Sequence, residues 1–505
     1  MTPHRILLTL LPSLMWLACQ QETIAQTRPH TDRPIPNASS GVPSNPGQLG
    51  SVVIPNVPFI QQKPDFCGEA CVEMALRRLG HRVSQDDFFT ISGVDPLLGR
   101  GVVARELVSG LKRLGFEPGK VWYDIPRAQK RQATLEAQFA QLHRDLRASV
   151  PSIICTHYDS SPNTTQHFRL VLGYDVKRDE VIYHEPAVDG GSYRRMARRE
   201  MLALWPLPYR PDHDLVIRIP LKYTRLQIPR LPRVEHAAAD YVQHVMKLQP
   251  TLRRLRGRFP MVIEPPFVVT GTVSPRELRA HARGLIRWSV AELKRRYFAR
   301  DPAQIVTIYL FGDRPSYEVN ARRLTGQPAG TPFGFYSPSQ HALIMNISTG
   351  RGTLVHEIVH PFMETNFPDC PPWFNEGMGS LYEGVGRRNH PIWGYLNWRL
   401  PGLQQAIRRG AVPAFAHLMR MNETQFYEQD SGTNYAQSRY LLYYLQDKGL
   451  LQTYYHAFVK NHGKDPTGYQ TLKQVLGEPG RDMTAFQRTW EQHVLGQKRT
   501  RPPVK

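Results

Sequence analysis

The sequence of 505 residues is poor in cysteine, in acidic side chains and in long apolar segments. Its five cysteines are too few and too irregularly spaced for a disulfide framework in a chain of this length. Beyond the first 25 residues, no apolar segment has the length that a membrane-spanning helix needs. These features exclude a small disulfide-stabilised protein and a protein with several membrane spans. The length and the 41% hydrophobic content predict two or three globular domains.

Cys71 is predicted to be a buried core thiol. It falls on the apolar face of an expected helix, together with Met74, Ala75 and Leu79. A disulfide between Cys71 and Cys155 is the alternative that the sequence leaves open.

The charge balance is strongly basic, with 64 Lys and Arg against 43 Asp and Glu and a formal net charge of +21. Such an excess favours anionic surroundings, such as envelope polymers, acidic lipid surfaces or nucleic acid. The arginines form only short clusters, for example Arg194-Arg195 and Arg253-Arg254, and no nucleic-acid-binding module is recognisable. We interpret the clusters as solvated helix faces and expect no specific nucleic-acid binding. Anionic cell-envelope polymers remain as expected partners.

Residues 1–25 have the organisation of a secretory signal, because Arg5 precedes an apolar run that is followed by polar residues. The segment Leu17-Ala18-Cys19 resembles the end of a bacterial lipoprotein signal, which would make Cys19 a lipid anchor. Cleavage of an ordinary signal near Ala25 is the alternative. Both interpretations predict export, and the protein would be periplasmic, a membrane-anchored lipoprotein or secreted.

The strongest chemical pattern is His356-Glu357-Ile358-Val359-His360, an HExxH motif. Residues four apart lie on one side of a helix, so both imidazoles can reach one metal ion while Glu357 faces the same cleft. Pro361 follows directly, and a proline there removes a helical hydrogen bond. We therefore expect the helix to kink or end at His360.

A carboxylate downstream completes a ligand set. The segment Trp373-Phe-Asn-Glu-Gly-Met-Gly is predicted to begin a second helix, with Glu376 in its first turns. Two histidines and one carboxylate leave a fourth zinc position open for water, as a catalytic zinc site requires. With His356, His360 and Glu376 as ligands, Glu357 would act as general base.

HExxH followed by Asn-Glu-Gly resembles the glutamate-type zincin metallopeptidases, and particularly the bacterial peptidases of the MA-like group. The resemblance implies a small mixed sheet that includes the segments starting at Phe267, Val306 and Gly334. It also implies that the strand before the zinc helix is an edge strand along which a substrate backbone can lie. Tyr435, at the start of a later helix, would steady the oxyanion of the intermediate.

A second pattern lies near the N-terminus, where a loop delivers Cys67 to the start of a helix. The positive end of the helix dipole is expected to lower the pKa of this thiol and to make a nucleophilic thiolate available. About a hundred residues later, His167 begins an expected strand, and the expected strand that follows it ends at Glu185-Pro186.

This order of glutamine, cysteine, histidine and acid resembles the papain-like cysteine peptidases of the bacteriocin-leader-processing, double-glycine type. The resemblance implies that Cys67 is the nucleophile, His167 the base, and Glu185 the residue that orients the histidine. Gln62, with Gln61 as the alternative, would help to form the oxyanion hole. The family usually has aspartate before this proline, and the longer glutamate is expected to displace the hydrogen bond to the imidazole.

The sequence therefore predicts an α+β chain with two catalytic-type domains. A flexible linker, 26–50, precedes a papain-like domain, and a connector with a helix from Val234 to Leu255 leads to a zincin-like domain with a small mixed sheet and a mainly helical C-terminal half. That half is expected to include a helical segment from Trp393 to Trp398. The expected boundaries are 51–222 for the papain-like domain, 223–262 for the connector, 263–497 for the zincin-like domain and 498–505 for a basic tail.

The preferred hypothesis is an exported zinc metallopeptidase with a second thiol-peptidase site, acting on peptides or proteins. Two alternatives stay open at this point. In the first, only the zinc site is catalytic and the N-terminal domain binds peptide; in the second, the whole chain is a catalytically degenerate envelope-binding scaffold.

Overall fold

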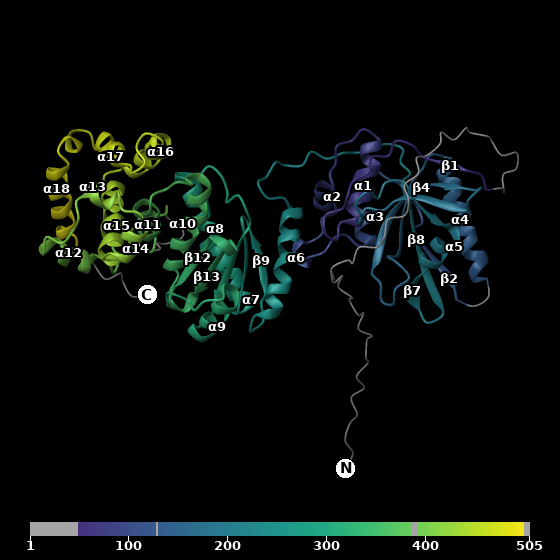
Figure 1. Ribbon diagram of the computed structural model, residues 1–505, viewed down its shortest axis with the longest axis horizontal. Helices are drawn as coiled ribbons and strands as arrows, with labels where there is room; N and C mark the ends of the chain where they lie inside the picture. The colour runs from purple at the N-terminus through teal and green to yellow at the C-terminus, as the bar shows by residue number, and fades with distance from the viewer. Residues whose placement is uncertain (1–48, 128–129, 385–390, 499–505) are drawn as a thin grey trace, which may run out of the picture. The chain divides into compact units, whose positions relative to one another are not determined.

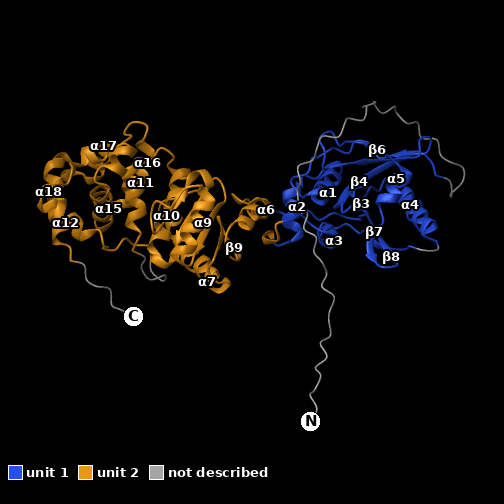
Figure 2. Cartoon of the chain, turned by 60° about the horizontal axis from the view of Figure 1, so that its bottom comes forward, with its two compact units in different colours: residues 1–95, 100–231 blue, residues 96–99, 232–505 orange. Residues whose placement is uncertain are grey.

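The computed structural model describes residues 49–127, 130–384 and 391–498, which divide into two compact units. Unit 1 comprises the chain up to residue 95 and residues 100–231, and unit 2 comprises residues 96–99 and 232 onward (Figures 1 and 2). The expected signal segment, most of the 26–50 linker, Cys19 and residues 499–505 lie outside the described residues. Among the described helices, none is long and apolar enough to cross a membrane.

Unit 1 is built on an antiparallel sheet with strand order β2-β8-β3-β4-β5-β6, with β1 paired to β4 and β7 paired to β8. The strands are β1 (Val52–Val53), β2 (Trp122–Pro126), β3 (Ser152–His157), β4 (Gln166–Asp175), β5 (Glu180–His184), β6 (Arg194–Ala197), β7 (Leu207–Arg210) and β8 (His213–Pro220). The central strands β3 and β4 are almost wholly buried. The strand predicted to begin at His167 corresponds to β4, and the strand predicted to end at Glu185 corresponds to β5, which ends one residue earlier at His184.

The helices of unit 1 are α1 (Cys67–Arg78), α2 (Gln85–Ser92), α3 (Ala104–Arg113), α4 (Arg131–Arg147) and α5 (Arg198–Leu204). Helix α1 packs on β4, and Gly68 makes this close approach feasible, because a β-carbon there would lie 3.1 Å from the Phe168 ring. Helix α2 begins with a capping box, in which the side chains of Ser84 and Asp87 each accept a backbone N–H from the other residue.

Unit 2 contains a five-stranded sheet with the order β12-β13-β11-β10-β9. Its strands are β9 (Met261–Glu264), β10 (Phe267–Gly271), β11 (Val306–Phe311), β12 (Gly334–Ser337) and β13 (Ala342–Asn346). The central pairs β10–β11 and β11–β13 are parallel and the outer pairs antiparallel, so the sheet is mixed, as predicted. Strand β12 forms one edge of the sheet.

Both faces of this sheet are covered, because alternate residues of each strand point to opposite sides. Phe267, Val269 and Ile308 face the core with α7 (Pro275–Ala280), the π-helical turn His281–Ile286, α8 (Arg287–Arg296) and α10 (Gly352–Asn366). Val268 and Tyr309 face the other side, with α6 (Ala238–Arg254) and α9 (Arg314–Thr325). Helix α6 and strand β9, which the sequence analysis assigned largely to a connector, thus belong to the sheet layer of unit 2.

The remainder of unit 2 is mainly helical, as expected. Its helices are α11 (Pro372–Leu381), α12 (Leu400–Arg408), α13 (Phe415–Leu418), α14 (Glu423–Glu428), α15 (Ser431–Asp447), α16 (Leu451–Asn461), α17 (Tyr469–Leu476) and α18 (Met483–Gly496). Helix α15 packs along α11, which brings the second half of the unit against the helix that carries Glu376.

The prediction of a helix between Trp393 and Trp398 is wrong, because this segment is irregular and α12 begins only at Leu400. Tertiary partners satisfy its backbone instead. The N–H of Gly394 donates to Oε1 of Gln446, whose Nε2 donates to the Gly394 carbonyl, and the buried Arg439 donates to the Tyr395 carbonyl. These contacts come from α15 and are not encoded in the local sequence.

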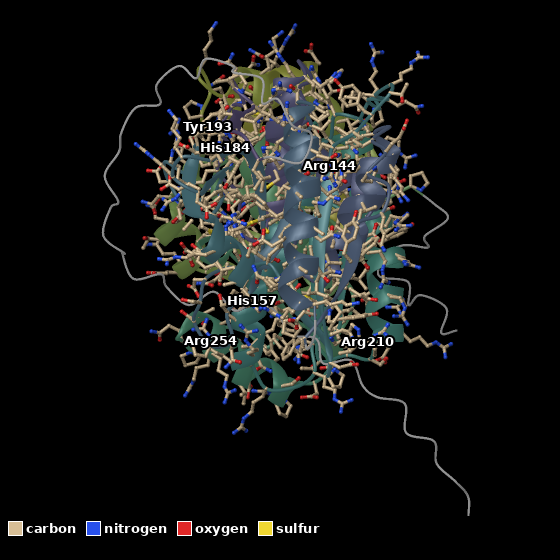
Figure 3. All side chains as sticks on the ribbon, turned by 90° about the vertical axis from the view of Figure 1, so that its right-hand side faces the viewer. Arg144, His157, His184, Tyr193, Arg210 and Arg254 are labelled. Carbon is tan, nitrogen blue, oxygen red and sulfur yellow. The ribbon has the colours of Figure 1, made fainter. Side chains whose placement is uncertain are left out.

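Of the two arginine clusters interpreted as helix faces, Arg253-Arg254 lies in the last turn of α6, as expected, whereas Arg194-Arg195 lies on strand β6, so that interpretation is wrong for the second cluster. Arg144, Arg210 and Arg254 are exposed and belong to different elements (Figure 3). Within unit 1, Arg195 pairs with Asp175 and Glu180. Many arginines therefore balance local carboxylates instead of forming one cationic surface.

Candidate active sites

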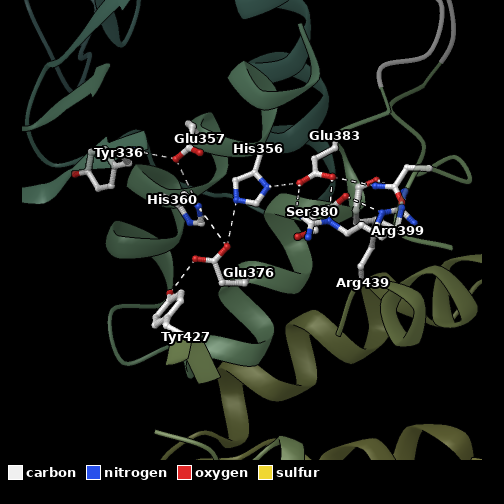
Figure 4. Close-up of polar contacts among 12 residues, drawn as sticks. Tyr336, His356, Glu357, His360, Glu376, Ser380, Glu383, Arg399, Tyr427 and Arg439 are labelled. Atoms are coloured by element: carbon white, nitrogen blue, oxygen red, sulfur yellow. Dashed lines mark hydrogen bonds and ion pairs between the residues drawn. The ribbon is translucent and has the colours of Figure 1, made fainter. Parts of the chain in front are cut away.

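Helices α10 and α11 bring the HExxH residues and Glu376 together (Figure 4). The side chains of His356, Glu357 and His360 offer ligand atoms that lie within 4.8 Å of one another. Oε2 of Glu376 lies 3.2 Å from Nε2 of His356 and 4.0 Å from Nε2 of His360. The three ligands predicted from the sequence, and the predicted base, therefore meet at one point.

Helix α10 continues past Pro361 to Asn366, so of the two expected outcomes, a kink or an end at His360, the end is wrong. The proline removes one donor, but tertiary packing holds the next turn, in which Phe362 and Met363 are fully buried in the core. The second histidine is thus held in the interior of a helix, with a regular turn on either side.

The outer nitrogen of each imidazole faces an acceptor. Nδ1 of His356 lies 3.2 Å from Oε1 of Glu383, and Nδ1 of His360 lies 3.0 Å from Oδ1 of Asn375. Because both partners are acceptors, each Nδ1 carries a proton, and each Nε2 faces the interior of the site. Arg399 and Asn397 in turn hold the Glu383 carboxylate.

This proton arrangement tests whether a metal ion fits. With the proton of His356 on Nδ1, the 3.2 Å contact from Nε2 to Glu376 places two lone pairs face to face. Only a second proton on the ring or a cation between the atoms makes that contact favourable. Two imidazoles and one carboxylate are a donor set that suits zinc, so the residues fit the expected ion.

The pKa values of two buried carboxylates agree with a site that favours a bound cation. Burial acts to raise the pKa of Glu376, but His360, His356 and Tyr427 outweigh it and bring the pKa down to about 2. Burial likewise opposes a low pKa for Glu383, yet its contacts with His356 and Arg399 lower it to about 2. Both carboxylates are therefore ionised at neutral pH.

Burial raises the pKa of Glu357, although His356 and His360 act in the opposite direction. Its Oε2 accepts the backbone N–H of Tyr336 from edge strand β12 at 2.9 Å, which fixes the carboxylate beside the sheet edge (Figure 4). Tyr336 also donates its hydroxyl to Glu364, one turn beyond His360.

The site opens into a cavity of about 1140 Å³. Strand β12 forms part of its wall through Gly334, Phe335 and Tyr336, so an edge strand lies beside the predicted ligands. The expectation that the strand directly before the zinc helix forms the edge is wrong, because that strand is β13, which lies between β12 and β11. The carboxylates of Glu376 and Glu383 also line the cavity, together with aromatic rings that include Trp398.

Two tyrosines reach Glu376 from the C-terminal helices. Tyr427, on α14, donates its hydroxyl to Oε1 of Glu376 at 2.8 Å. The predicted residue Tyr435, on α15, also lines the cavity, and burial together with the charge of Glu376 raises the pKa of its hydroxyl. Both phenols therefore stay protonated and can donate hydrogen bonds into the site.

In unit 1, Cys67 is the first residue of α1 and is partly exposed, whereas Cys71 and Cys155 are buried; all are free thiols. The predicted core role of Cys71 is confirmed. The expected lowering of the Cys67 pKa is wrong, because burial raises it well above its usual value and the Glu69 and Asp65 carboxylates add to the effect. A hydrogen bond from the Phe168 N–H acts in the opposite direction and places the sulfur beside the start of β4.

His167 and Glu185 are joined as predicted. Nε2 of His167 makes a short hydrogen bond to Oε1 of Glu185, so the extra methylene of glutamate has not displaced this contact. The ring of Tyr158 packs edge-on against the imidazole, with centroids 5.2 Å apart. Burial opposes a low pKa for Glu185, but the contacts with His167 and Arg169 outweigh it and lower the pKa.

The two glutamines before Cys67 differ in placement. Gln61 is exposed, whereas Gln62 is half-buried and its N–H donates to the Pro186 carbonyl at 2.9 Å, next to Glu185. Within the described part of the chain, the buried Oε1 of Gln62 has no hydrogen-bond partner. Gln62 is thus the glutamine that lies inside the fold beside the acid.

Sequence reasoning missed the residues that hold the site residues in place. Glu383 was visible seven residues after Glu376, but its contact with His356 depends on how α10 and α11 pack. Tyr427 and Arg399 lie in segments without a motif. Arg169 follows His167 by two positions on one face of β4, and this spacing could have identified it.

A comparison with protein families identifies a domain within unit 1. Residues 54–208 match the family model described as Peptidase_C39 like family, so unit 1 contains a peptidase C39-like domain. Among solved structures, the peptidase domain of Streptococcus ComA, a bifunctional ABC transporter involved in quorum sensing, is 16% identical. It covers 33% of this chain and 99% of its own, with a TM-score of 0.21. No curated protein matches.

Proposed function

We propose that this protein is an exported peptidase that hydrolyses peptide bonds at a zinc site in unit 2. The observation that carries the proposal is the convergence of His356 and His360, each held through Nδ1, on the ionised carboxylate of Glu376. Zinc held there would act as a Lewis acid toward a peptide carbonyl and would make a water molecule more acidic.

The side chains around the ligands would carry out proton transfer, oxyanion stabilisation and substrate binding. Glu357, fixed by the Tyr336 N–H, accepts the proton of the attacking water and can pass it to the leaving amine. Tyr435, which lines the cavity, would donate a hydrogen bond to the developing oxyanion. The edge of β12 offers backbone groups to an extended peptide, which is why peptides and proteins are the proposed substrates.

A cleavage profile of a mixed peptide library by the full chain tests this function. Glu357→Gln should abolish cleavage and keep zinc in a metal analysis, whereas Glu376→Gln should lose the metal. Cys67→Ala serves as the matched control and should leave zinc-dependent cleavage unchanged. Cleavage that survives Glu357→Gln and removal of zinc by a chelator would contradict the zinc site as the working centre.

The C39-like domain supports a second candidate function, a thiol peptidase. The supporting observation is the hydrogen bond between His167 and Glu185, which leaves Nδ1 of the imidazole to accept the proton of Cys67. Gln62 would complete an oxyanion hole with the backbone N–H at the start of α1. Because burial favours the neutral thiol of Cys67, the site depends on His167 to take the proton of this thiol.

Selective alkylation separates this function from a domain that only binds peptide. A thiol peptidase should label at Cys67 at least tenfold faster than at Cys370, which is also partly exposed, and His167→Ala should remove the difference. Equal, slow labelling of the two thiols would favour the binding domain. A chain with neither reactive Cys67 nor bound zinc would be the envelope-binding scaffold.

We also propose that the basic chain works among anionic polymers of the cell envelope after export, anchored through Cys19 or released. Fractionation of cells expressing the full chain, with Cys19→Ala as the control, would distinguish an anchored from a released protein. Retention of the full-length precursor in the cytoplasm would contradict export.

A further inference from the structure

The carboxylate of Glu185 lies between two cationic or proton-bearing partners. Oε1 accepts from Nε2 of His167, and Oε2 accepts from Nε of Arg169 at 2.7 Å. We infer that Arg169 is a positioning residue of the thiol site, which holds Glu185 so that this carboxylate keeps its hydrogen bond to His167. The inference rests on the proposed thiol-peptidase function and extends it to a residue outside the predicted set.

The three side chains are almost fully buried, with exposed fractions of 5% for His167, 5% for Arg169 and 4% for Glu185. A buried carboxylate requires a partner charge, because the interior does not stabilise it as water does. Arg169 supplies that charge on the side of Glu185 opposite the imidazole. The ion pair therefore keeps Glu185 ionised and able to accept the hydrogen bond from His167.

Arg169 is itself fixed at every nitrogen of its guanidinium. Nη1 donates to Oγ1 of Thr156 and, at 3.1 Å, to the carbonyl of His157, and Nη2 donates to the carbonyl of Tyr158 at 2.6 Å. These acceptors belong to the end of β3 and the residue after it. The guanidinium cannot turn without breaking several bonds, so it can act as a rigid reference for the carboxylate.

This rigidity matters because glutamate has one more rotatable bond than aspartate. An unrestrained Glu185 side chain would sample rotamers in which neither oxygen reaches His167. The backbone N–H of Ala187 also donates to Oε1 at 3.2 Å, whereas Arg169 is the residue that donates to Oε2 among those the structure describes. A contact at each oxygen defines the plane of the carboxylate, as one contact could not.

Other charged and titratable groups surround the same pair, and the test must separate their effects. Those that act on Glu185 or Arg169 are Cys71 from α1, Cys155 and Tyr158 from β3 and the turn after it, Asp159, and Tyr183 from β5. Asp65 and Glu69 act on Cys67, and Arg194 from β6 acts on the two tyrosines. None of them replaces the contact between Arg169 and Oε2 of Glu185.

The experiment measures the rate at which iodoacetamide modifies Cys67 in the full chain as a function of pH, with mass spectrometry of the Cys67 peptide. In Arg169→Met, the midpoint of the profile should move to higher pH by about one unit and the rate at pH 7 should fall about tenfold, because Glu185 no longer supports protonated His167. Arg169→Lys keeps the positive charge but lacks the planar guanidinium that donates from several nitrogens. Its midpoint and its rate at pH 7 should therefore lie between those of the unmodified chain and of Arg169→Met.

A double variant separates positioning from general support of the fold. Because Arg169 acts through Glu185, Glu185→Gln with Arg169→Met should be no slower than Glu185→Gln alone. Arg195→Met removes an ion-paired arginine from the same sheet and should leave the profile unchanged. Far-ultraviolet circular dichroism and exclusion of label from the buried Cys71 confirm that each variant is folded.

Three results would overturn the inference. An unchanged profile in Arg169→Met would remove the positioning role, and a shift to lower pH would show that Arg169 competes with His167 for the carboxylate. Additive losses in the double variant would show that Arg169 acts by another route. Because alkylation needs no peptide cleavage, a fast Cys67 that ignores Arg169 contradicts this inference alone, whereas a Cys67 insensitive to His167→Ala contradicts the thiol-peptidase function as well.

Discussion

Nδ1 of His356 lies 3.2 Å from Oε1 of Glu383, and Arg399 holds the same oxygen at 2.8 Å. The two residues are 27 positions apart, yet their contact determines which nitrogen of the imidazole faces Glu376. Because Asn397 also donates to Glu383, the carboxylate is held from three directions. The metal-facing geometry of the first histidine therefore depends on residues outside the HExxH motif.

Glu383→Gln is expected to weaken zinc binding about 10- to 100-fold, because the amide retains the shape but not the charge that supports His356. Competition against a chelator of known affinity, with metal analysis of the recovered protein, measures the change. Glu428→Gln alters an exposed glutamate of the same unit and should have no effect. A zinc affinity within twofold of the unmodified chain would show that Glu383 does not hold the ligand.

Gly379→Ala is expected to abolish stoichiometric zinc binding without unfolding unit 2. A β-carbon on Gly379 would lie 3.0 Å from Nε2 of His356, so the ring must move away from Glu376. Gly402→Ala is the matched control, because it adds the same methyl group to another helix with nothing within 4 Å. Zinc content and circular dichroism should separate the two variants, and equal zinc content in both would contradict the predicted displacement.

The helices and strands around the sites follow from local patterns in the sequence. The spacing of His356 and His360 is a property of one helix, and Ser84 with Asp87 forms a capping box within four residues, so both were predictable. The irregular segment around Gly394 was not, because its backbone partners come from α15, about fifty residues away. Hydrogen bonds between residues so far apart in the sequence produce no local periodic pattern of apolar and polar residues.

Electrostatic properties were less predictable than positions. A helix N-terminus lowers the pKa of an exposed thiol, but for Cys67 the effect of burial is larger and has the opposite sign. The contact of Glu185 with His167 was expected to be displaced, yet Arg169 holds the other oxygen. Both outcomes depend on how many neighbours surround a side chain, which a motif does not encode.

Two tyrosines beside Glu376 should affect different steps. Tyr427→Phe removes the hydrogen bond to Oε1 of Glu376 and is expected to weaken zinc binding about three- to tenfold. Tyr435→Phe, which removes a hydroxyl that also acts on Glu376, is expected to weaken zinc binding no more than Tyr427→Phe does and to lower kcat about a hundredfold, as loss of an oxyanion donor does. Zinc titrations and steady-state kinetics on the same peptide measure both. Equal effects of the two variants on kcat and on zinc affinity would contradict this division.

Glu69 should make unit 1 less stable as the pH rises. Oε1 of Glu69 accepts the Val102 N–H at 2.8 Å, and Oε2 is buried without a hydrogen-bond partner in the described part of the chain. Burial, with Asp65 and Glu106 adding to it, raises the pKa of this carboxyl from 4.5 to about 8. Between these values the folded state holds a proton that the unfolded state has lost, so the free energy of unfolding falls as pH increases from about 4.5 to 8 and then levels off.

The pH dependence of the free energy of unfolding, and its removal by Glu69→Gln, can be measured with a probe that reports on unit 1 alone. Between pH 5 and pH 8 the loss should be on the order of 3 to 4 kcal/mol, and Glu69→Gln should remove most of it because the amide does not titrate. Oxidation of the buried Met74 by hydrogen peroxide across a urea series reports the unfolding of α1 at both pH values. The exposed Glu200 supplies the control Glu200→Gln. If Glu69→Gln retained the full dependence, Glu69 would have to be ionised in the folded state, and the titrating group would have to be another.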